Sequence, residues 1–292
     1  MNRTAELQLI AQGKQQYHFR AANLDQLLRG IRTRYGLAQG TVQFEDTLPH
    51  HITAWSQHSG DSQFPHSEHF EYHNNSWGFR CAHTGQPVPV MAFGCSVTYG
   101  VGVPQHYTWS SQLSRIIAQP VANYGISGFS TSEMAHMFTH LTRFHQPHTA
   151  IFLLPEHTRT MLTAVSNGNI FSFNAFDNYR QSFPIGTSPE RHRACASYYA
   201  LPSTQHVDRF FTDIHSICTI AESRNIGVLF ATWSRATQML LEQQDLSVYT
   251  TQCNILPFLQ SDSLGRDQAH PGMLYHLQLA QHIAQQLNNT SS

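Results

Sequence analysis

The chain carries little charge, and lysine is almost absent from it. Only 12% of the 292 residues are charged, Lys14 is the only lysine, and the formal net charge is -1 at pH 7. Binding to nucleic acid depends on clustered lysine and arginine side chains that neutralise phosphates. The composition therefore argues against a nucleic-acid partner, and we expect none.

Long apolar runs and paired cysteine motifs are missing as well. No segment approaches the roughly 20 consecutive apolar residues that a membrane-spanning helix needs. The segment from Met1 to Gln8 lacks the basic-then-apolar order of a signal peptide. The five cysteines include no C-x-x-C pair, which favours neither a disulfide framework nor a zinc ribbon. We therefore expect a reduced, cytoplasmic protein without a membrane span.

Histidine is abundant, with 20 copies, and two groups have spacings that metal sites use. One group is formed by His66, Glu68, His69 and His73, and the other by the i, i+4 pair His136 and His140. At this histidine content such spacings arise by chance, and Pro65 argues against a regular helix in the first group. We expect no metal site and no cofactor.

Two short motifs near opposite ends of the chain carry the candidate chemistry. The apolar run Met91-Ala92-Phe93 stops at the turn Gly94-Cys95-Ser96, and Asp267-Gln268-Ala269-His270 lies near the other end. A hydroxyl is a poor nucleophile at neutral pH unless a base removes its proton, and a carboxylate makes that base more effective. The motifs predict a serine hydrolase with Ser96 as nucleophile, His270 as base and Asp267 as its orienting acid. The alternative is that Asp267 and His270 only cap the last helix.

The spacing of these motifs narrows the class of hydrolase. An α/β-hydrolase elbow has the pattern Gly-x-Ser-x-Gly, but here the next glycine is Gly100, four residues after Ser96. A Gly-x-Ser block combined with a terminal Asp-x-x-His block resembles the SGNH (GDSL-type) hydrolases. The resemblance covers residues 86 to 288, with Cys95 in place of the aspartate of the first family block.

The second and third conserved blocks of that family are matched less closely by this sequence. The segment Val121–Thr131 resembles the second block, which implies that the Gly128 amide helps to form an oxyanion hole, with Gly125 as the alternative. The third family block supplies an asparagine donor, and here His157 occupies that position after the run 149–154. The resemblance thus implies an oxyanion hole made of Ser96, Gly128 and His157, although the substituted histidine leaves its third donor open.

From residue 86 onward, apolar runs alternate with helical patterns. The patterns predict strands at 88–93, 120–124, 149–154 and 226–232, and helices at 107–118, 131–144, 207–224 and 273–287. Strands that are apolar throughout and separated by helices imply a parallel sheet covered on both faces. With the family resemblance, we expect a flavodoxin-like three-layer α/β/α sandwich whose ligands bind beyond the carboxyl ends of the strands.

The organisation of the chain changes near residue 86. We expect residues 1–85 to form an N-terminal helix, with Leu24, Leu27, Leu28 and Ile31 on one face, and an extended arm that packs on the core. Residues 86–292 would form the catalytic domain. An insertion at about 155–205 interrupts the alternation and either lines the substrate pocket or is a surface excursion.

The expected function is hydrolysis of a small-molecule or glycan ester through an acyl-enzyme. One alternative is acyl transfer to a sugar hydroxyl, because the same acyl-enzyme reacts with whichever nucleophile the pocket admits. Another is a binding protein that keeps the fold and has lost catalysis. Neither the substrate nor the oligomeric state follows from the sequence.

Overall fold

The computed structural model describes residues 21–42, 70–163, 170–173, 203–244, 253–265 and 270–290. Its centre is a five-stranded sheet in the order β4-β3-β5-β8-β9, and every neighbouring pair is parallel. The predicted parallel sheet is therefore confirmed. The strands are β3 (Val90–Gly94), β4 (Val121–Asn123), β5 (Thr149–Leu154), β8 (Gly227–Thr232) and β9 (Cys253–Ile255).

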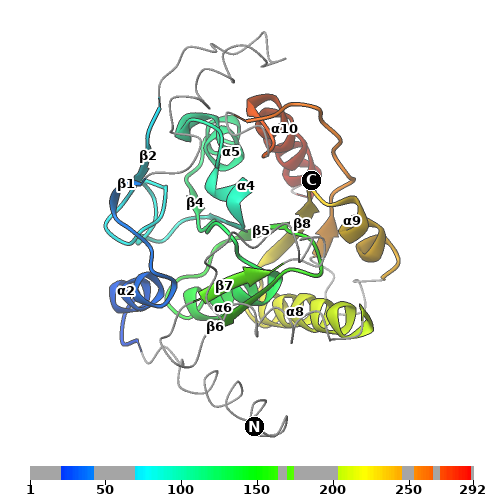
Figure 1. The fold of residues 1–292 in the computed structure, drawn as a ribbon, viewed down its shortest axis with the longest axis horizontal. Coiled ribbons are helices and arrows are strands. Elements are labelled where there is room, and N and C mark those ends of the chain that lie inside the picture. Colours follow the sequence, from blue (N-terminus) through cyan, green and yellow to red (C-terminus); the bar gives the residue numbers. More distant parts are fainter. Residues whose placement is uncertain are drawn as a thin grey trace, which may run out of the picture.

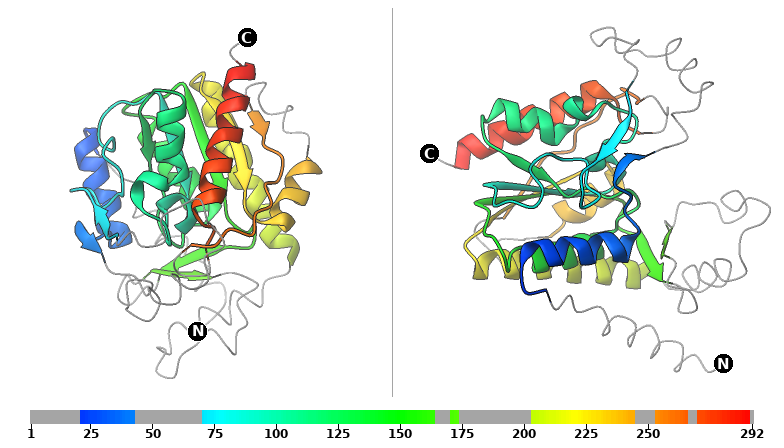
Figure 2. Two further views of the ribbon diagram at one scale, coloured as in Figure 1. Left: turned by 90° about the horizontal axis from the view of Figure 1, so that it is seen from above. Right: turned by 90° about the vertical axis from the view of Figure 1, so that its left-hand side faces the viewer.

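Helices cover both faces of this sheet, as the sequence pattern predicts (Figures 1 and 2). One face carries α5 (Trp109–Ile116) and α10 (Met273–Thr290), which pack on each other. The other face carries α2 (Leu24–Tyr35), α6 (Thr131–Leu141) and α8 (Ser203–Ser223). The α/β/α architecture is confirmed, and α9 (Arg235–Glu242) follows β8 at the side of the sheet.

Aromatic side chains stack across the central strands because the register aligns them. Phe93, Phe152 and Phe230 are register neighbours on β3, β5 and β8. The rings of Phe93 and Phe152 are stacked with centroids 4.9 Å apart, and Tyr124 stacks on Phe93 at 5.6 Å. Offset stacking adds to the free energy gained by burying these rings. The apolar runs of the sequence thus become a continuous core between the two helix layers.

The N-terminal helix and part of the arm pack on this core. Asn23 caps α2 by accepting a hydrogen bond from the Gln26 amide, and Leu27, Leu28 and Ile31 are buried in the same cluster as the sheet residues. After α2, β1 (Gly40–Val42) pairs antiparallel with β2 (Tyr72–Asn74). The predicted helix is confirmed, whereas the domain boundary at residue 85 stays a prediction.

Several short elements were not expected from the sequence. They are the helix α4 (Ser96–Tyr99), the 3-10 turn η2 (Gln105–Tyr107), the hairpin of β6 (Thr160–Thr163) and β7 (Ile170–Phe173), α9 and β9. Each is too short to produce a clear period in the sequence. The hairpin opens the predicted insertion, of which 164–169 and 174–202 lie outside the described residues.

The order of the strands reverses at one point in the sheet. The first two strands to enter the sheet, β3 and β4, lie on one side of the order, and β5, β8 and β9 follow on the other, so the order reverses between β3 and β5. In open parallel sheets, ligands bind beyond the carboxyl ends of the strands at such a reversal. In the described parts of the chain, no helix is long and apolar enough to cross a membrane.

Candidate active site

The serine predicted as nucleophile begins α4, directly after β3. A side chain at Gly94 would place its Cβ 1.9 Å from Thr98 Oγ1 and 3.1 Å from the Leu153 carbonyl oxygen. Only glycine fits between β5 and α4 at this point, and its small size lets the chain turn sharply from strand to helix. Ser96 is 5% exposed, and its Oγ lies 3.8 Å from the buried Cys95 Sγ.

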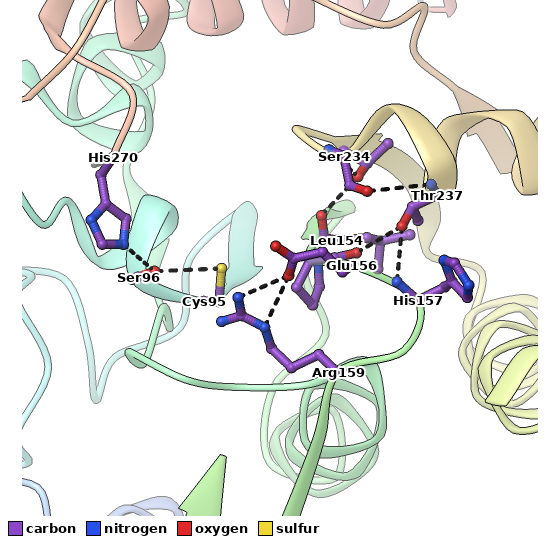
Figure 3. Close-up of polar contacts among 11 residues, drawn as sticks. Cys95, Ser96, Leu154, Glu156, His157, Arg159, Ser234, Thr237 and His270 are labelled. Atoms are coloured by element: carbon purple, nitrogen blue, oxygen red, sulfur yellow. Dashed lines mark hydrogen bonds and ion pairs between the residues drawn. The ribbon is translucent and has the colours of Figure 1, made fainter. Parts of the chain in front are cut away.

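Ser96 and His270 meet although 174 residues separate them in the chain. The Nε2 atom of His270 lies 2.8 Å from Ser96 Oγ, which is hydrogen-bonding distance (Figure 3). With the imidazole proton on Nδ1, Nε2 accepts the hydroxyl proton, and this is the tautomer that a general base needs. The structure therefore brings together two of the three residues that the end motifs singled out.

Backbone hydrogen bonds between residues 263–265 and 270–272 position His270. The Gly265 amide donates to the His270 carbonyl at 2.7 Å, and the Gly272 amide donates to the Ser263 carbonyl at 2.9 Å. A side chain at Gly272 would approach the Leu264 carbonyl oxygen to 2.4 Å. These hydrogen bonds and the antiparallel bridge between Leu264 and Pro271 fix the backbone on both sides of residues 266–269. Asp267 lies in that segment, outside the described residues, so its role stays a prediction.

The connection after β4 runs beside the nucleophile turn. The Ile126 amide donates to the Gly94 carbonyl at 3.1 Å, and a side chain at Gly125 would approach the Tyr99 amide nitrogen to 2.4 Å. Asn123, which the sequence interpretation did not single out, donates from Nδ2 to the Thr98 carbonyl at 2.7 Å and accepts from the Gly125 amide at 2.8 Å. This buried asparagine ties α4 to the loop.

Gly128 lies two residues farther along the same connection, with a left-handed φ of 83°. The Phe129 amide donates to the Ile126 carbonyl at 3.1 Å, which closes a turn around Ser127 and Gly128. Glycine adopts this backbone conformation without the steric cost that other residues have. The loop thus follows the carboxyl edge of the sheet next to Ser96, and the contribution of the Gly128 amide to an oxyanion hole stays a prediction.

His157 is not directed at the nucleophile. Its ring packs edge-on against Phe210 of α8, with centroids 6.3 Å apart, and Figure 3 shows it on the side of the loop away from Ser96. Its backbone amide donates to Thr237 Oγ1 at 2.9 Å, which holds the residue beside α9. Burial, and then the positive charge of His206, lower the pKa of His157. The predicted oxyanion role of His157 receives no support from this placement.

The neighbours of His157 in the loop after β5 point the other way. Glu156 and Arg159 form an ion pair, and their side chains extend toward the side of Cys95 and Ser96 (Figure 3). The Nη2 and Nε atoms of Arg159 lie 2.8 Å and 3.1 Å from Glu156 Oε2. Sequence reasoning missed this pair, although an i, i+3 spacing of opposite charges directly after a buried strand is a readable signal.

A buried arginine of the N-terminal arm supports the loop that follows α4. Arg80 is 2% exposed, and it donates to the carbonyls of Gly100 at 2.6 Å and of Val103 at 2.9 Å. Its guanidinium lies 4.5 Å from the centre of the Tyr72 ring, and the Tyr72 hydroxyl accepts from the Gly102 amide at 2.7 Å. The arm therefore fixes the loop that leads out of the nucleophile helix.

The two histidine groups with metal-like spacing have different outcomes. In the first group, His66, Glu68 and His69 lie outside the described residues. In the second, the rings of His136 and His140 contact each other on α6, with centroids 4.5 Å apart. Within the described residues, no group of three or more metal-ligating side chains comes together.

No model of a known protein family matches the chain, and no curated protein matches it. Solved structures do match its fold. A protein from Desulfitobacterium hafniense DCB-2, described as a lipolytic protein of the G-D-S-L family, is 15% identical, with a TM-score of 0.41 over 67% of this chain and 97% of that one. The structure of TesA is 12% identical, with a TM-score of 0.45 over 68% of this chain and 98% of that one.

A third match is a carbohydrate esterase of family 2, with a carbohydrate-binding domain, from Corynascus thermopiles (Myceliophthora fergusii). It is 14% identical, with a TM-score of 0.41 over 70% of this chain and 67% of that one. At these identities the likenesses concern the arrangement of strands and helices, and no activity is carried over from them. About two thirds of the chain is similar in fold to proteins of the GDSL and carbohydrate esterase groups.

Proposed function

We propose that this protein is a serine esterase that hydrolyses a carboxylic ester through an acyl-enzyme. The observation that carries the proposal is the 2.8 Å contact between Ser96 Oγ and His270 Nε2. A serine that directly follows a central strand and is hydrogen-bonded to a histidine has the geometry of an activated nucleophile. A histidine that served only to cap α10 has no reason to meet this hydroxyl.

In the proposed reaction, Ser96 Oγ attacks the acyl carbonyl carbon while its proton moves to His270 Nε2. The carbonyl π bond opens, and its electron pair becomes the oxyanion of a tetrahedral intermediate. The intermediate collapses, the alcohol leaves with the proton from the imidazolium, and the acyl group stays on Ser96. Water then attacks the acyl-enzyme, again giving its proton to His270, and the acid is released.

Two further residues have supporting roles in the proposal. Asp267, three residues before His270, would accept from Nδ1–H and stabilise the imidazolium. The backbone amides of Ser96 and Gly128 would donate to the oxyanion, since Ser96 begins α4 and the Gly128 loop follows the same edge of the sheet. Small-molecule and glycan esters remain the proposed substrate class.

A fluorophosphonate probe tests the proposal directly, because it phosphonylates only an activated serine. We expect the full chain to be labelled, with the label on Ser96 by peptide mapping, and Ser96→Ala to remain unlabelled. A panel of short p-nitrophenyl esters and acetylated glycans then measures hydrolysis, and added sugar acceptors reveal acyl transfer. A folded chain that neither labels nor turns over any ester would overturn the proposal in favour of a non-catalytic binding protein.

A further inference from the structure

The loop after β5 lies beside the nucleophile because β3 and β5 are adjacent parallel strands. Gly94 at the end of β3 is the register neighbour of Leu153, the next-to-last residue of β5. The segments that follow both strands therefore leave the sheet at the same edge. In Figure 3, the guanidinium of Arg159 extends from the β5 side toward Cys95 and Ser96, whereas the His157 ring extends toward α8.

The bonding of Arg159 leaves part of its guanidinium available. Glu156 Oε2 accepts from Nε and Nη2, on one edge of the group. Within the described part of the chain, Nη1 makes no hydrogen bond, so its two N–H groups can donate to a ligand. The side chains of Arg159 and Glu156 are only 15% and 10% exposed, which keeps the pair in a poorly solvated environment. A hydrogen bond in such surroundings is stronger than in water.

The backbone and the flat face of Arg159 are both supported. Arg209 of α8 donates to the Arg159 carbonyl at 3.3 Å and to Thr160 Oγ1 at 2.9 Å. The guanidinium carbon lies 5.9 Å from the centre of the Trp233 ring, which follows β8. Contacts on this many sides hold the guanidinium in place before a ligand arrives, which is what transition-state stabilisation requires.

We propose that Arg159 is a catalytic residue whose Nη1 donates to the oxyanion formed on the substrate when Ser96 attacks. The inference rests on the proposed esterase function. Arginine stays protonated at any working pH, so the donor is always present. Glu156 balances its charge in the resting enzyme, so the pair does not select for an anionic substrate. The negative charge that develops on the carbonyl oxygen is then the new partner of the guanidinium.

The central experiment compares Arg159→Gln and Arg159→Lys with the parent on one ester. Loss of an oxyanion donor lowers kcat by about 10²- to 10³-fold with little change in KM, and we expect this for Arg159→Gln. Arg159→Lys restores a cationic donor at a different position and recovers part of the loss. Arg143→Ala is the matched control, because Arg143 is an exposed arginine after α6, and we expect this variant to keep the parental kcat.

Chemical rescue separates a donor from a structural support. We expect guanidinium ion, added at concentrations that leave the parent folded, to raise kcat of Arg159→Ala, and ammonium ion to do less. Because removing Arg159 alone leaves Glu156 without its partner, the double variant Glu156→Gln/Arg159→Gln is measured as well. It removes both charges, and we expect the same loss of turnover together with a melting temperature close to that of the parent.

Three results would overturn the inference. The first is an Arg159→Gln enzyme with parental kcat. The second is a variant that raises KM alone, which would assign Arg159 to substrate binding. The third is a loss of kcat in His157→Ala that Arg159→Gln does not share, which would return the donor role to the histidine. Failure of the esterase proposal itself is distinct, because the parent chain would then neither label at Ser96 nor hydrolyse any ester.

Discussion

The loops that follow the adjacent strands β3 and β5 are held by different means. The turn after β3 is packed too closely for any side chain at Gly94, where a Cβ would lie 1.9 Å from Thr98 Oγ1 and 3.1 Å from the Leu153 carbonyl oxygen. The loop after β5 is held by side chains, through the Glu156–Arg159 ion pair and the hydroxyl of Thr237. Close packing of this kind leaves a glycine in the sequence motif, whereas the i, i+3 ion pair leaves a charge spacing that does not show which way the side chains point.

The largest loss of activity should come from replacing Ser96, in the turn after β3, or its partner His270. We expect Ser96→Ala and His270→Ala each to abolish esterase turnover, because the residues of a catalytic triad act as a unit and single losses in a well-measured protease reach roughly 10⁶-fold. The free energy of unfolding should change little in Ser96→Ala. Steady-state kinetics on one ester, with a melting curve for each variant, provide the measurement.

The double variant sharpens this prediction. If Ser96 and His270 act together, Ser96→Ala/His270→Ala should be little worse than either single variant. A Ser96→Ala enzyme with parental turnover on every ester that the parent accepts would contradict the assignment of the nucleophile.

The next largest loss of activity is expected for Asp267, the carboxylate of the Asp-x-x-His motif. Asp267→Asn should preserve the fold and lower kcat, because an amide favours the wrong imidazole tautomer of His270; in the trypsin-like example the loss is about 10⁴-fold. The pH profile of kcat should change with it, since the imidazolium loses its stabilising carboxylate. Unchanged turnover in Asp267→Asn would mean that another group orients His270.

The contrast between the loops also explains which residues could be predicted. Ser96 and His270 follow from short motifs because a sharp turn at each site demands glycine nearby, at Gly94 and Gly272. The long helices follow from hydrophobic period, as for α8, and the central strands follow from continuous apolar runs, as for β5. These features depend on residues close in sequence, so they can be predicted from local patterns in a single sequence.

The direction of a side chain in the loop after β5 could not be predicted in the same way. Counting residues from the strand end selects His157, but its ring packs against Phe210 of α8, an element more than 50 residues farther along the chain. The Arg159 side chain extends toward Cys95 and Ser96, where Glu156 and Trp233 hold it. The direction of these side chains is set by packing against residues distant in sequence, and the local sequence pattern carries no information about those contacts.

A stability measurement tests the difference between the loops. Gly94→Ala forces a methyl group against Thr98 and the Leu153 carbonyl, and we expect it to lower the free energy of unfolding by about 3 kcal/mol or more. Thr237→Val removes the acceptor of the His157 amide and the donor to the Pro155 carbonyl, and should cost about 1–3 kcal/mol. Urea unfolding of both variants gives the comparison.

The outcome for activity should differ as well. Gly94→Ala displaces the start of α4 and should remove fluorophosphonate labelling even where the chain still folds. Thr237→Val should leave labelling of Ser96 intact, since the contact with His270 is independent of the loop after β5. Equal losses of labelling in the two variants would show that the loops are not held separately.

The last predicted effect concerns only the pH dependence of stability, and it comes from a histidine buried between α10 and α5. His276 of α10 is fully buried, and its Nδ1 accepts from the Trp109 amide at 3.0 Å. Burial, then the charges of Arg80 and His270, lower its pKa to about 3. The ordinary value in an unfolded chain is about 6.5, so the unfolded state takes up this proton first as the pH falls. Neutral His276 therefore contributes stability that is complete above about pH 6.5 and is lost progressively toward pH 3.

Replacing His276 by asparagine should reduce this pH dependence. The asparagine Oδ1 can accept from the Trp109 amide as Nδ1 does, but it does not titrate. In the parent, this one group should lower the free energy of unfolding by about 2 kcal/mol between pH 7 and pH 5, and His276→Asn should lack that share of the decrease. His145, whose pKa burial lowers to about 4, adds a similar slope that the variant retains. Urea unfolding at the two pH values measures the difference, and identical slopes in parent and variant would mean that His276 is not held neutral against α5.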